Sequence, residues 1–261
     1  MIPLSRAREI LIATALLAVI AGPAGAAEKS KPAKPVAVSV NPYALQVLDK
    51  ACTLLESAKA LSYHAEINFD SVLPSGVKLQ FAAAMDVAIQ RPDHLAVSYA
   101  SDLGGKRLWY DGKTMTLLDP AHMTYATVAA PASIDAMFEQ FAKKKVSIPL
   151  EGFDFSHPCE RIRGKLIRGT FVGVGDVDSA DCDHLAFMQK DVDWQIWISR
   201  EKPALPRKIV ITYVAMPMAP QYSAVLSQWN FDPKFPASFF EPQIPKNAVR
   251  VKYLEVKEKR K

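Results

Sequence analysis

The fold of this chain is decided by residues 62–128, which read SYHAEINFDSVLPSGVKLQFAAAMDVAIQRPDHLAVSYASDLGGKRLWYDGKTMTLLDPAHMTYATV. Apolar and polar residues alternate along much of this stretch, as they do in strands with one buried face. Short turn sequences interrupt the alternation: Pro74-Ser75-Gly76, Arg91-Pro92-Asp93, Gly104-Gly105, Asp111-Gly112 and Asp119-Pro120. Turns this short join neighbouring antiparallel strands. We therefore expect a meander with strands at 62–72, 77–90, 94–101, 107–110, 114–118 and 124–128.

Two helices and a second series of strands flank this meander. Asn41 followed by Pro42 is a helix-start signal, and apolar residues at helical spacing continue to about Ala60. A second amphipathic helix is expected over 131–144. The strand pattern resumes at 169–174, 184–190, 193–199, 206–214, 222–231 and 249–255. These elements predict an α+β, mainly β fold: one strongly curved antiparallel sheet, or half-open barrel, with helices plugging its concave face.

The N-terminus has the three parts of a secretory signal peptide. Arg6 and Arg8 precede an apolar run from Ile10 to Ile20, and small residues follow as far as Ala26. This run is shorter than the roughly 20 residues of a membrane span. We therefore expect cleavage after Ala26, a periplasmic location and a soluble mature chain. The predicted organisation is a signal peptide at 1–26, a flexible leader at 27–41, a single domain at 42–256 and a basic tail at 257–261.

The formal net charge of +5 comes largely from short basic clusters at 143–145, 161–168 and 257–261. Two interpretations stay open. The clusters are either solvated surface or a means of attraction to anionic lipid head groups, which is worth about 1 kcal/mol per basic residue near a membrane. The second interpretation allows a partner at the membrane surface or among the envelope proteins. We expect no nucleic-acid partner.

Three cysteines, Cys52, Cys159 and Cys182, lie in the predicted mature chain. An oxidising compartment favours one disulfide, and the sequence allows three pairings. We favour Cys159 with Cys182, because Cys52 falls inside a helical pattern and the other two flank loop-rich segments. Such a bridge would contribute roughly 3 kcal/mol by restricting the unfolded chain.

Motifs for catalysis, metals and cofactors are absent from the sequence. The five histidines are scattered, with no H-E-x-x-H and no paired C-x-x-C, so we expect no metal site. The acidic group Asp176, Asp178, Asp181 and Asp183 lacks the glycine and glutamate positions of an EF-hand loop, and a solvated turn is the simpler interpretation. No nucleophile elbow, P-loop or dinucleotide fingerprint occurs. We expect no cofactor and no catalytic residue.

Several segments, read in order, carry a family resemblance. Arg91-Pro92-Asp93-His94-Leu95, Trp109-Tyr110-Asp111-Gly112-Lys113, Asp119-Pro120 and Tyr125 resemble the LolA, LolB and LppX lipoprotein-carrier superfamily. The later segments are similar to an uncharacterised family of predicted periplasmic proteins: Cys182-Asp183-His184-Leu185-Ala186-Phe187, Val192 to Ile198, Leu205-Pro206 and Gln228-Trp229-Asn230. The matches span roughly Pro42 to Tyr253.

The resemblance implies a half-open barrel that holds acyl chains of a lipid or lipoprotein in an apolar cavity beneath helical lids. It also implies that Arg91 holds the lid through backbone carbonyls, whereas a turn arginine in solvent is the plainer alternative. Side chains that could line the cavity are Leu55, Phe81, Met85, Leu95, Val97, Trp109, Phe138 and Phe141, although side chains of this kind are more often ordinary core. The leading hypothesis is a non-enzymatic periplasmic carrier. An interaction module with a filled core is the alternative, and an enzyme comes third.

Overall fold

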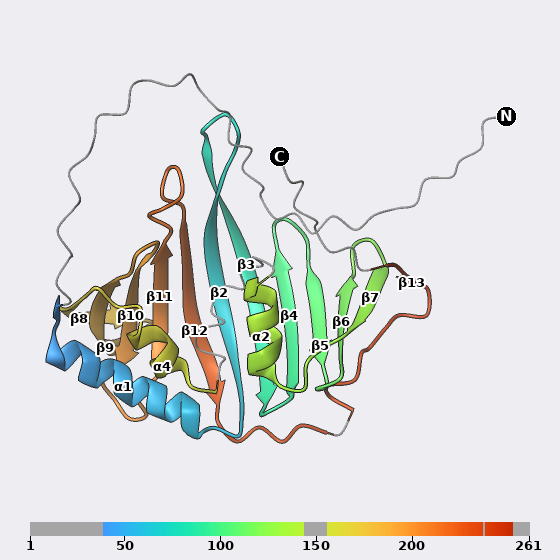
Figure 1. Cartoon of the computed structure of the whole chain (residues 1–261), viewed down its shortest axis with the longest axis horizontal. Coiled ribbons are helices and arrows are strands. Elements are labelled where there is room, and N and C mark those ends of the chain that lie inside the picture. The colour runs from blue at the N-terminus through green and yellow to red at the C-terminus, as the bar shows by residue number, and fades with distance from the viewer. Residues whose placement is uncertain (1–38, 144–155, 237, 253–261) are drawn as a thin grey trace.

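One long, strongly curved sheet dominates the structure (Figure 1). The computed structural model describes residues 39–143, 156–236 and 238–252, and within these the side chains of residues 141–143, 159 and 161 are not described. The sheet has 13 strands in the order β1-β8-β9-β10-β11-β12-β2-β3-β4-β5-β6-β7-β13. Because this order begins at β1 and ends at β13, the described sheet is curved but not closed on itself.

Most strands follow one another along the chain and pair antiparallel with their sequence neighbours, as expected for hairpin connections. The two short edge strands are exceptions, since β1 pairs with β8 and β13 pairs with β7 in parallel. The strands are β1 (Ser39–Val40), β2 (Ala60–Val72), β3 (Lys78–Gln90), β4 (His94–Ser101), β5 (Lys106–Tyr110), β6 (Thr114–Asp119), β7 (Thr124–Ala129), β8 (Arg168–Val177), β9 (Ala180–Met188), β10 (Asp193–Ser199), β11 (Pro206–Thr212), β12 (Gln221–Asn230) and β13 (Val249–Arg250).

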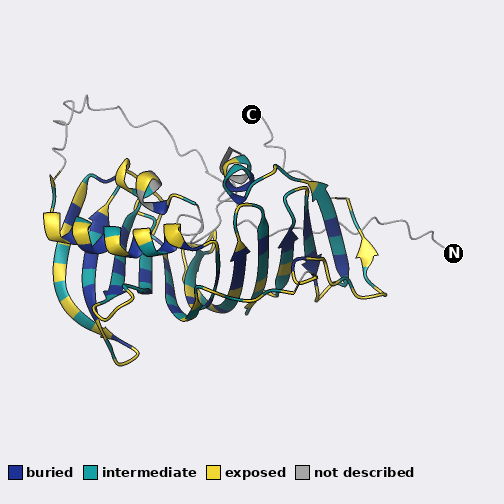
Figure 2. Ribbon diagram, turned by 90° about the horizontal axis from the view of Figure 1, so that it is seen from below, coloured by how far each residue is buried: buried dark blue, intermediate teal, exposed yellow. Residues whose placement is uncertain are grey.

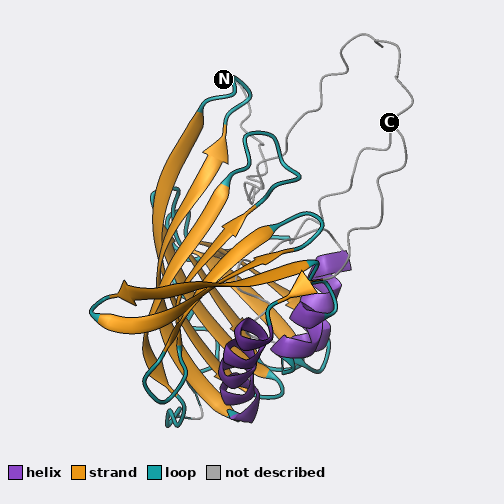
Figure 3. Ribbon diagram, turned by 90° about the vertical axis from the view of Figure 1, so that its left-hand side faces the viewer, coloured by secondary structure: helices purple, strands orange, loops and turns teal. Residues whose placement is uncertain are grey.

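The helices of the described residues lie on one side of the sheet; they are α1 (Pro42–Ser57), α2 (Ile134–Lys143) and α4 (Pro158–Arg163). Figures 2 and 3 show them on the concave side, which we call the inner face; the opposite side is the outer face. Helix α1 begins where predicted, because the Asn41 side chain accepts a hydrogen bond from the backbone N–H of Ala44 and Pro42 fills the first turn. None of the described helices is long and apolar enough to cross a membrane.

The hydrophobic core fills the space between the helices and the inner face. Leu48 and Ala51 of α1 and Ile134 and Met137 of α2 are at most 2% exposed, and they belong to one cluster with inner-face side chains such as Ile196. Burial of this surface, at about 25 cal/mol per Å² of apolar area, holds the helices to the sheet. The predicted mainly β, curved-sheet fold with helices on its concave side is therefore confirmed.

The differences from prediction lie in short elements. β1 and α4 were not predicted, because two residues of strand and six of helix are too short to show a period. The predicted strand at 249–255 is confirmed only at Val249–Arg250 within the described residues. The predicted signal peptide, most of the leader and the basic tail lie outside the described residues.

The predicted bridge between Cys159 and Cys182 is wrong. Cys182 is a free, buried thiol on β9, the third strand from one edge of the sheet, and its Sγ donates to the carbonyl of Ala180 at 3.3 Å. Its neighbours across the strands are Ser199 and Gly175. Cys52 of α1 takes part in a disulfide instead. The helical position that argued against Cys52 therefore did not prevent it from bridging.

Candidate ligand-binding face

The inner face carries rows of apolar side chains that run across neighbouring strands. Phe69 of β2 pairs with Phe81 of β3, and their ring centroids lie 5.8 Å apart. Two inner-face positions farther along β3, beyond Ala83, Met85 pairs with Tyr99 of β4. Because successive side chains of a strand point to opposite faces, this register places all four on the inner face. The next row continues the surface through Val87, Val97 and Leu108.

These rows become more exposed toward one end of the sheet. Ile67 and Val87 are at most 3% exposed, whereas the side chains farther along the same strands are half-buried. The half-buried members, all packed against the core, are Phe69, Phe81, Met85, Val97, Tyr99 and Leu108. The described residues thus leave an apolar surface next to the core that is only partly covered, and we call these six residues the apolar rows.

Helix α1 is fastened near its N-terminus by polar contacts. The hydroxyl of Tyr43 donates to Asp183 on β9 at 2.9 Å, and Asp183 is itself 6% exposed. That hydrogen bond is the main cause of the raised pKa of Tyr43. Asp49 in the middle of the helix forms an ion pair with Arg163 of α4. These contacts fix α1 to the sheet at β9 and to α4.

Arg91 fastens the other end of α1. Its Nη1 donates to the carbonyl oxygen of Ala58 at 2.7 Å and to that of Leu55 at 3.2 Å. The last carbonyls of a helix have no partner within the helix, and a cation there also suits the negative end of the helix dipole. Arg91 therefore contacts the backbone carbonyls that close the helix.

The predicted cavity residues fall into three groups. Phe81, Met85 and Val97 belong to the apolar rows. Leu55, Leu95 and Phe138 are at most 2% exposed and pack between the helices and the sheet. The side chain of Phe141 lies outside the described residues.

The expectation that Trp109 lines the same cavity as the other residues is wrong. Trp109 pairs with Ala96, which pairs with Ala88, so its side chain lies on the outer face. Its neighbour Tyr110 points inward and donates to the carbonyl of Pro131 ahead of α2. Sequence reasoning missed Phe69, Tyr99 and Leu108; they could have been found by pairing predicted strands across their turns.

The acidic group near residue 180 does not form a shared site. Asp178 and Ser179 occupy the hairpin turn between β8 and β9, both with positive φ, while Asp183 is buried beneath α1. Among the residues that the structure describes, no group of three or more His, Cys, Asp or Glu side chains could hold a metal ion.

Solved structures of low sequence identity are similar to this chain. LprF from Mycobacterium bovis is similar in structure with a TM-score of 0.46 and 14% identity, over 76% of this chain and 98% of that one. LppX from Mycobacterium tuberculosis has a TM-score of 0.43 and 10% identity, over 74% of this chain and 100% of that one. A LolA superfamily protein from Nitrosomonas europaea has a TM-score of 0.37 and 12% identity, over 76% of this chain and 97% of that one. No curated protein matches the chain significantly. Residues 44–254 match the family described as predicted periplasmic protein. The chain therefore belongs to this family, DUF2092, and is a protein of the periplasm.

Proposed function

We propose that this protein is a non-enzymatic periplasmic carrier that holds an acyl chain of a lipid or lipoprotein against its inner face. The observation that carries the proposal is the set of apolar rows, which lie beside the core and stay half-buried. Contiguous apolar surface of this kind usually marks a site of interaction. An acyl chain laid along it would gain about 0.8 kcal/mol per buried methylene.

The side chains suit an apolar ligand of variable shape. Met85 has three rotatable bonds and adapts to irregular surfaces, while Phe81 and Tyr99 offer flat rings. No charged side chain belongs to the apolar rows, so an acyl tail meets no desolvated charge there.

We further propose that α1 acts as a lid whose C-terminal end is held by Arg91. A carrier must cover the ligand from water and still release it. The two hydrogen bonds from the Arg91 guanidinium go to the backbone carbonyls of Leu55 and Ala58 at the end of α1, so breaking them would loosen that end of the helix first. The predicted signal peptide, cleaved after Ala26, would deliver the chain to the periplasm.

A fluorescent fatty acid tests the proposal. Met85→Glu places a charge in the apolar rows and should weaken dye binding by about tenfold or more, since each 1.4 kcal/mol lost is a factor of ten. Ala100→Glu is the matched control, because Ala100 is exposed on the outer face of the strand that pairs with β3. Equal dye binding by the two variants, with both folded by circular dichroism, would contradict the proposal.

A further inference from the structure

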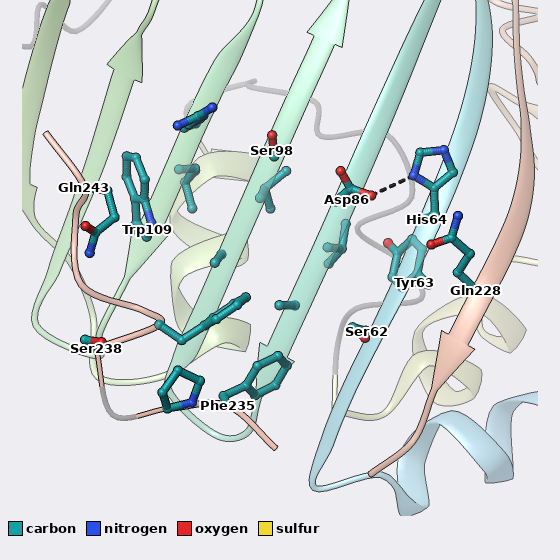
Figure 4. A pocket seen from close by; sticks show the side chains of 18 residues that line it. Ser62, Tyr63, His64, Asp86, Ser98, Trp109, Gln228, Phe235, Ser238 and Gln243 are labelled. Atoms are coloured by element: carbon teal, nitrogen blue, oxygen red, sulfur yellow. Dashed lines mark hydrogen bonds and ion pairs between the residues drawn. The ribbon is translucent and has the colours of Figure 1, made fainter. Parts of the chain in front are cut away.

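The outer face holds a hollow of about 690 Å³, on the side of the sheet opposite to the helices (Figure 4). Its floor is formed by β2, β3, β4 and β5. Residues 231–236 and 238–250 cross this face on their way to β13, and Phe235, Ser238 and Gln243 among them line the hollow. Its volume lies within the range of small-molecule sites.

The hollow exists because a row of short side chains crosses the sheet. Ser62, Ala88 and Ala96 are directly opposite one another on three adjacent strands, and Trp109 ends the row on the fourth. The row spans three interstrand spacings, or about 14 Å. The space between the sheet and the crossing segment is therefore long and flat-floored.

A strained residue directs an amide toward the hollow. Gln228 of β12 has a φ of 53°, in the left-handed region, and the register between β12 and β2 shifts there. Because of this irregularity Trp229 stays on the inner face, stacked on Tyr63, while Gln228 lines the hollow. Bulges are found beside functional sites, where they redirect a side chain, and non-glycine strain persists where it serves a site.

Polar groups of mixed character stand at both ends. At the β2 end the ring nitrogens of His64 form hydrogen bonds with the carboxylates of Asp86 at 2.7 Å and Glu66 at 2.9 Å. The side chain of Asp86 is nevertheless 70% exposed. Gln243 stands beside Trp109 at the other end (Figure 4). Amides and hydroxyls both donate and accept hydrogen bonds. A long acyl tail would leave these groups unsatisfied. The lining holds one carboxylate, Asp86, and one guanidinium, Arg107, so its charges balance and a neutral ligand suits it better than a polyanion.

We propose that this hollow is a second binding site, distinct from the inner face, for a short neutral oligosaccharide. Sugar hydroxyls match the amide, carboxylate and hydroxyl groups at the ends, and the carbon-bound faces of the rings pack on the aromatic side chains of Trp109 and Phe239. A row of about 14 Å is longer than one sugar ring.

Isothermal titration of the mature full-length protein with maltotriose, cellotriose and N,N′-diacetylchitobiose tests this. We expect at least one of the three to bind. Gln228→Gly relieves the left-handed strain but removes the amide, so it should leave thermal stability equal or higher while weakening binding about tenfold or more. Ser179→Gly relieves a similar strain, at φ 62°, in a turn remote from the hollow, and should leave binding unchanged.

Ala96→Leu provides a second variant, because its larger side chain fills the floor and should abolish sugar binding while leaving fatty-acid binding intact. Failure of all three sugars to bind at millimolar concentration would overturn the proposal. So would full affinity in both Gln228→Gly and Ala96→Leu. Loss of fatty-acid binding in Ala96→Leu would also overturn it, since the hollow would then be the acyl site.

Discussion

Replacement of Arg91 by leucine should loosen the end of α1 and lower the stability of the whole protein. The guanidinium makes one short and one longer hydrogen bond to the carbonyls of Ala58 and Leu55. Hydrogen bonds to a charged group contribute about 1.5–3 kcal/mol each, the longer one less, and the helix dipole adds a few tenths. We therefore expect Arg91→Leu to cost about 3 kcal/mol, which for a domain of this size lowers Tm by roughly 6–12 °C.

Two measurements locate the effect. Hydrogen–deuterium exchange should accelerate about 100-fold at the end of α1, as 3 kcal/mol of local opening implies. A bound fluorescent fatty acid should dissociate faster if α1 is the lid. Arg168→Leu is the control, because Arg168 is exposed near the edge of the sheet. Arg91→Lys tests geometry, since lysine keeps the charge but not the planar guanidinium.

The reasoning would be refuted if Arg91→Leu changed Tm by no more than about 1 °C and left exchange at the end of α1 unaltered. Unchanged dye release, with lowered Tm and faster exchange, would refute the lid alone. In that case Arg91 would be a structural helix cap.

Three further perturbations follow from the described contacts. Gly169→Ala should destabilise the protein and detach β1, because a Cβ there would clash with the side chain of Val40 in β1 and meet that of Phe187 at 2.8 Å; thermal melting measures the loss. Hydrogen bonds from Lys106 and His122 outweigh burial and lower the pKa of Asp119 from 3.8 to about 2, so the stabilisation, about 2 kcal/mol, is present above about pH 4 and lost as pH falls toward 2. Asp119→Asn should remove this acid-dependent part of the free energy of unfolding, measured by urea melts from pH 7 to pH 2. Dithiothreitol should lower the Tm of the protein and of Cys182→Ala equally, whereas Cys52→Ser should no longer respond; a response lost in Cys182→Ala would contradict the assignment.

Much of the sheet could be predicted because its information is local. The strands His94–Ser101 and Asp193–Ser199 occur with the boundaries that alternation and flanking turns predicted. Asn41 and Pro42 likewise define the start of α1 through contacts within one turn. These features depend on residues close together in sequence, so they can be predicted from the sequence alone.

The candidate site was predictable only in part, since it depends on contacts between distant residues. Periodicity identified Met85 as apolar and inward-facing, but it could not show that Trp109 faces the other way, because that depends on register across three strands. Contacts between distant parts of the chain also determine that Cys182 is a free thiol and that β12 has a bulge at Gln228. The hollow on the outer face needs residues 231–236 and 238–250 to cross the sheet, which no local pattern indicates.

The most direct test of the carrier function is native mass spectrometry, with lipid extraction, of protein purified from the periplasm without detergent. We predict a mass above that of the bare chain and extracted acyl species, both diminished in Met85→Glu and retained in Ala100→Glu. A clean unliganded mass from a protein that also fails to take up a fluorescent fatty acid would contradict the account.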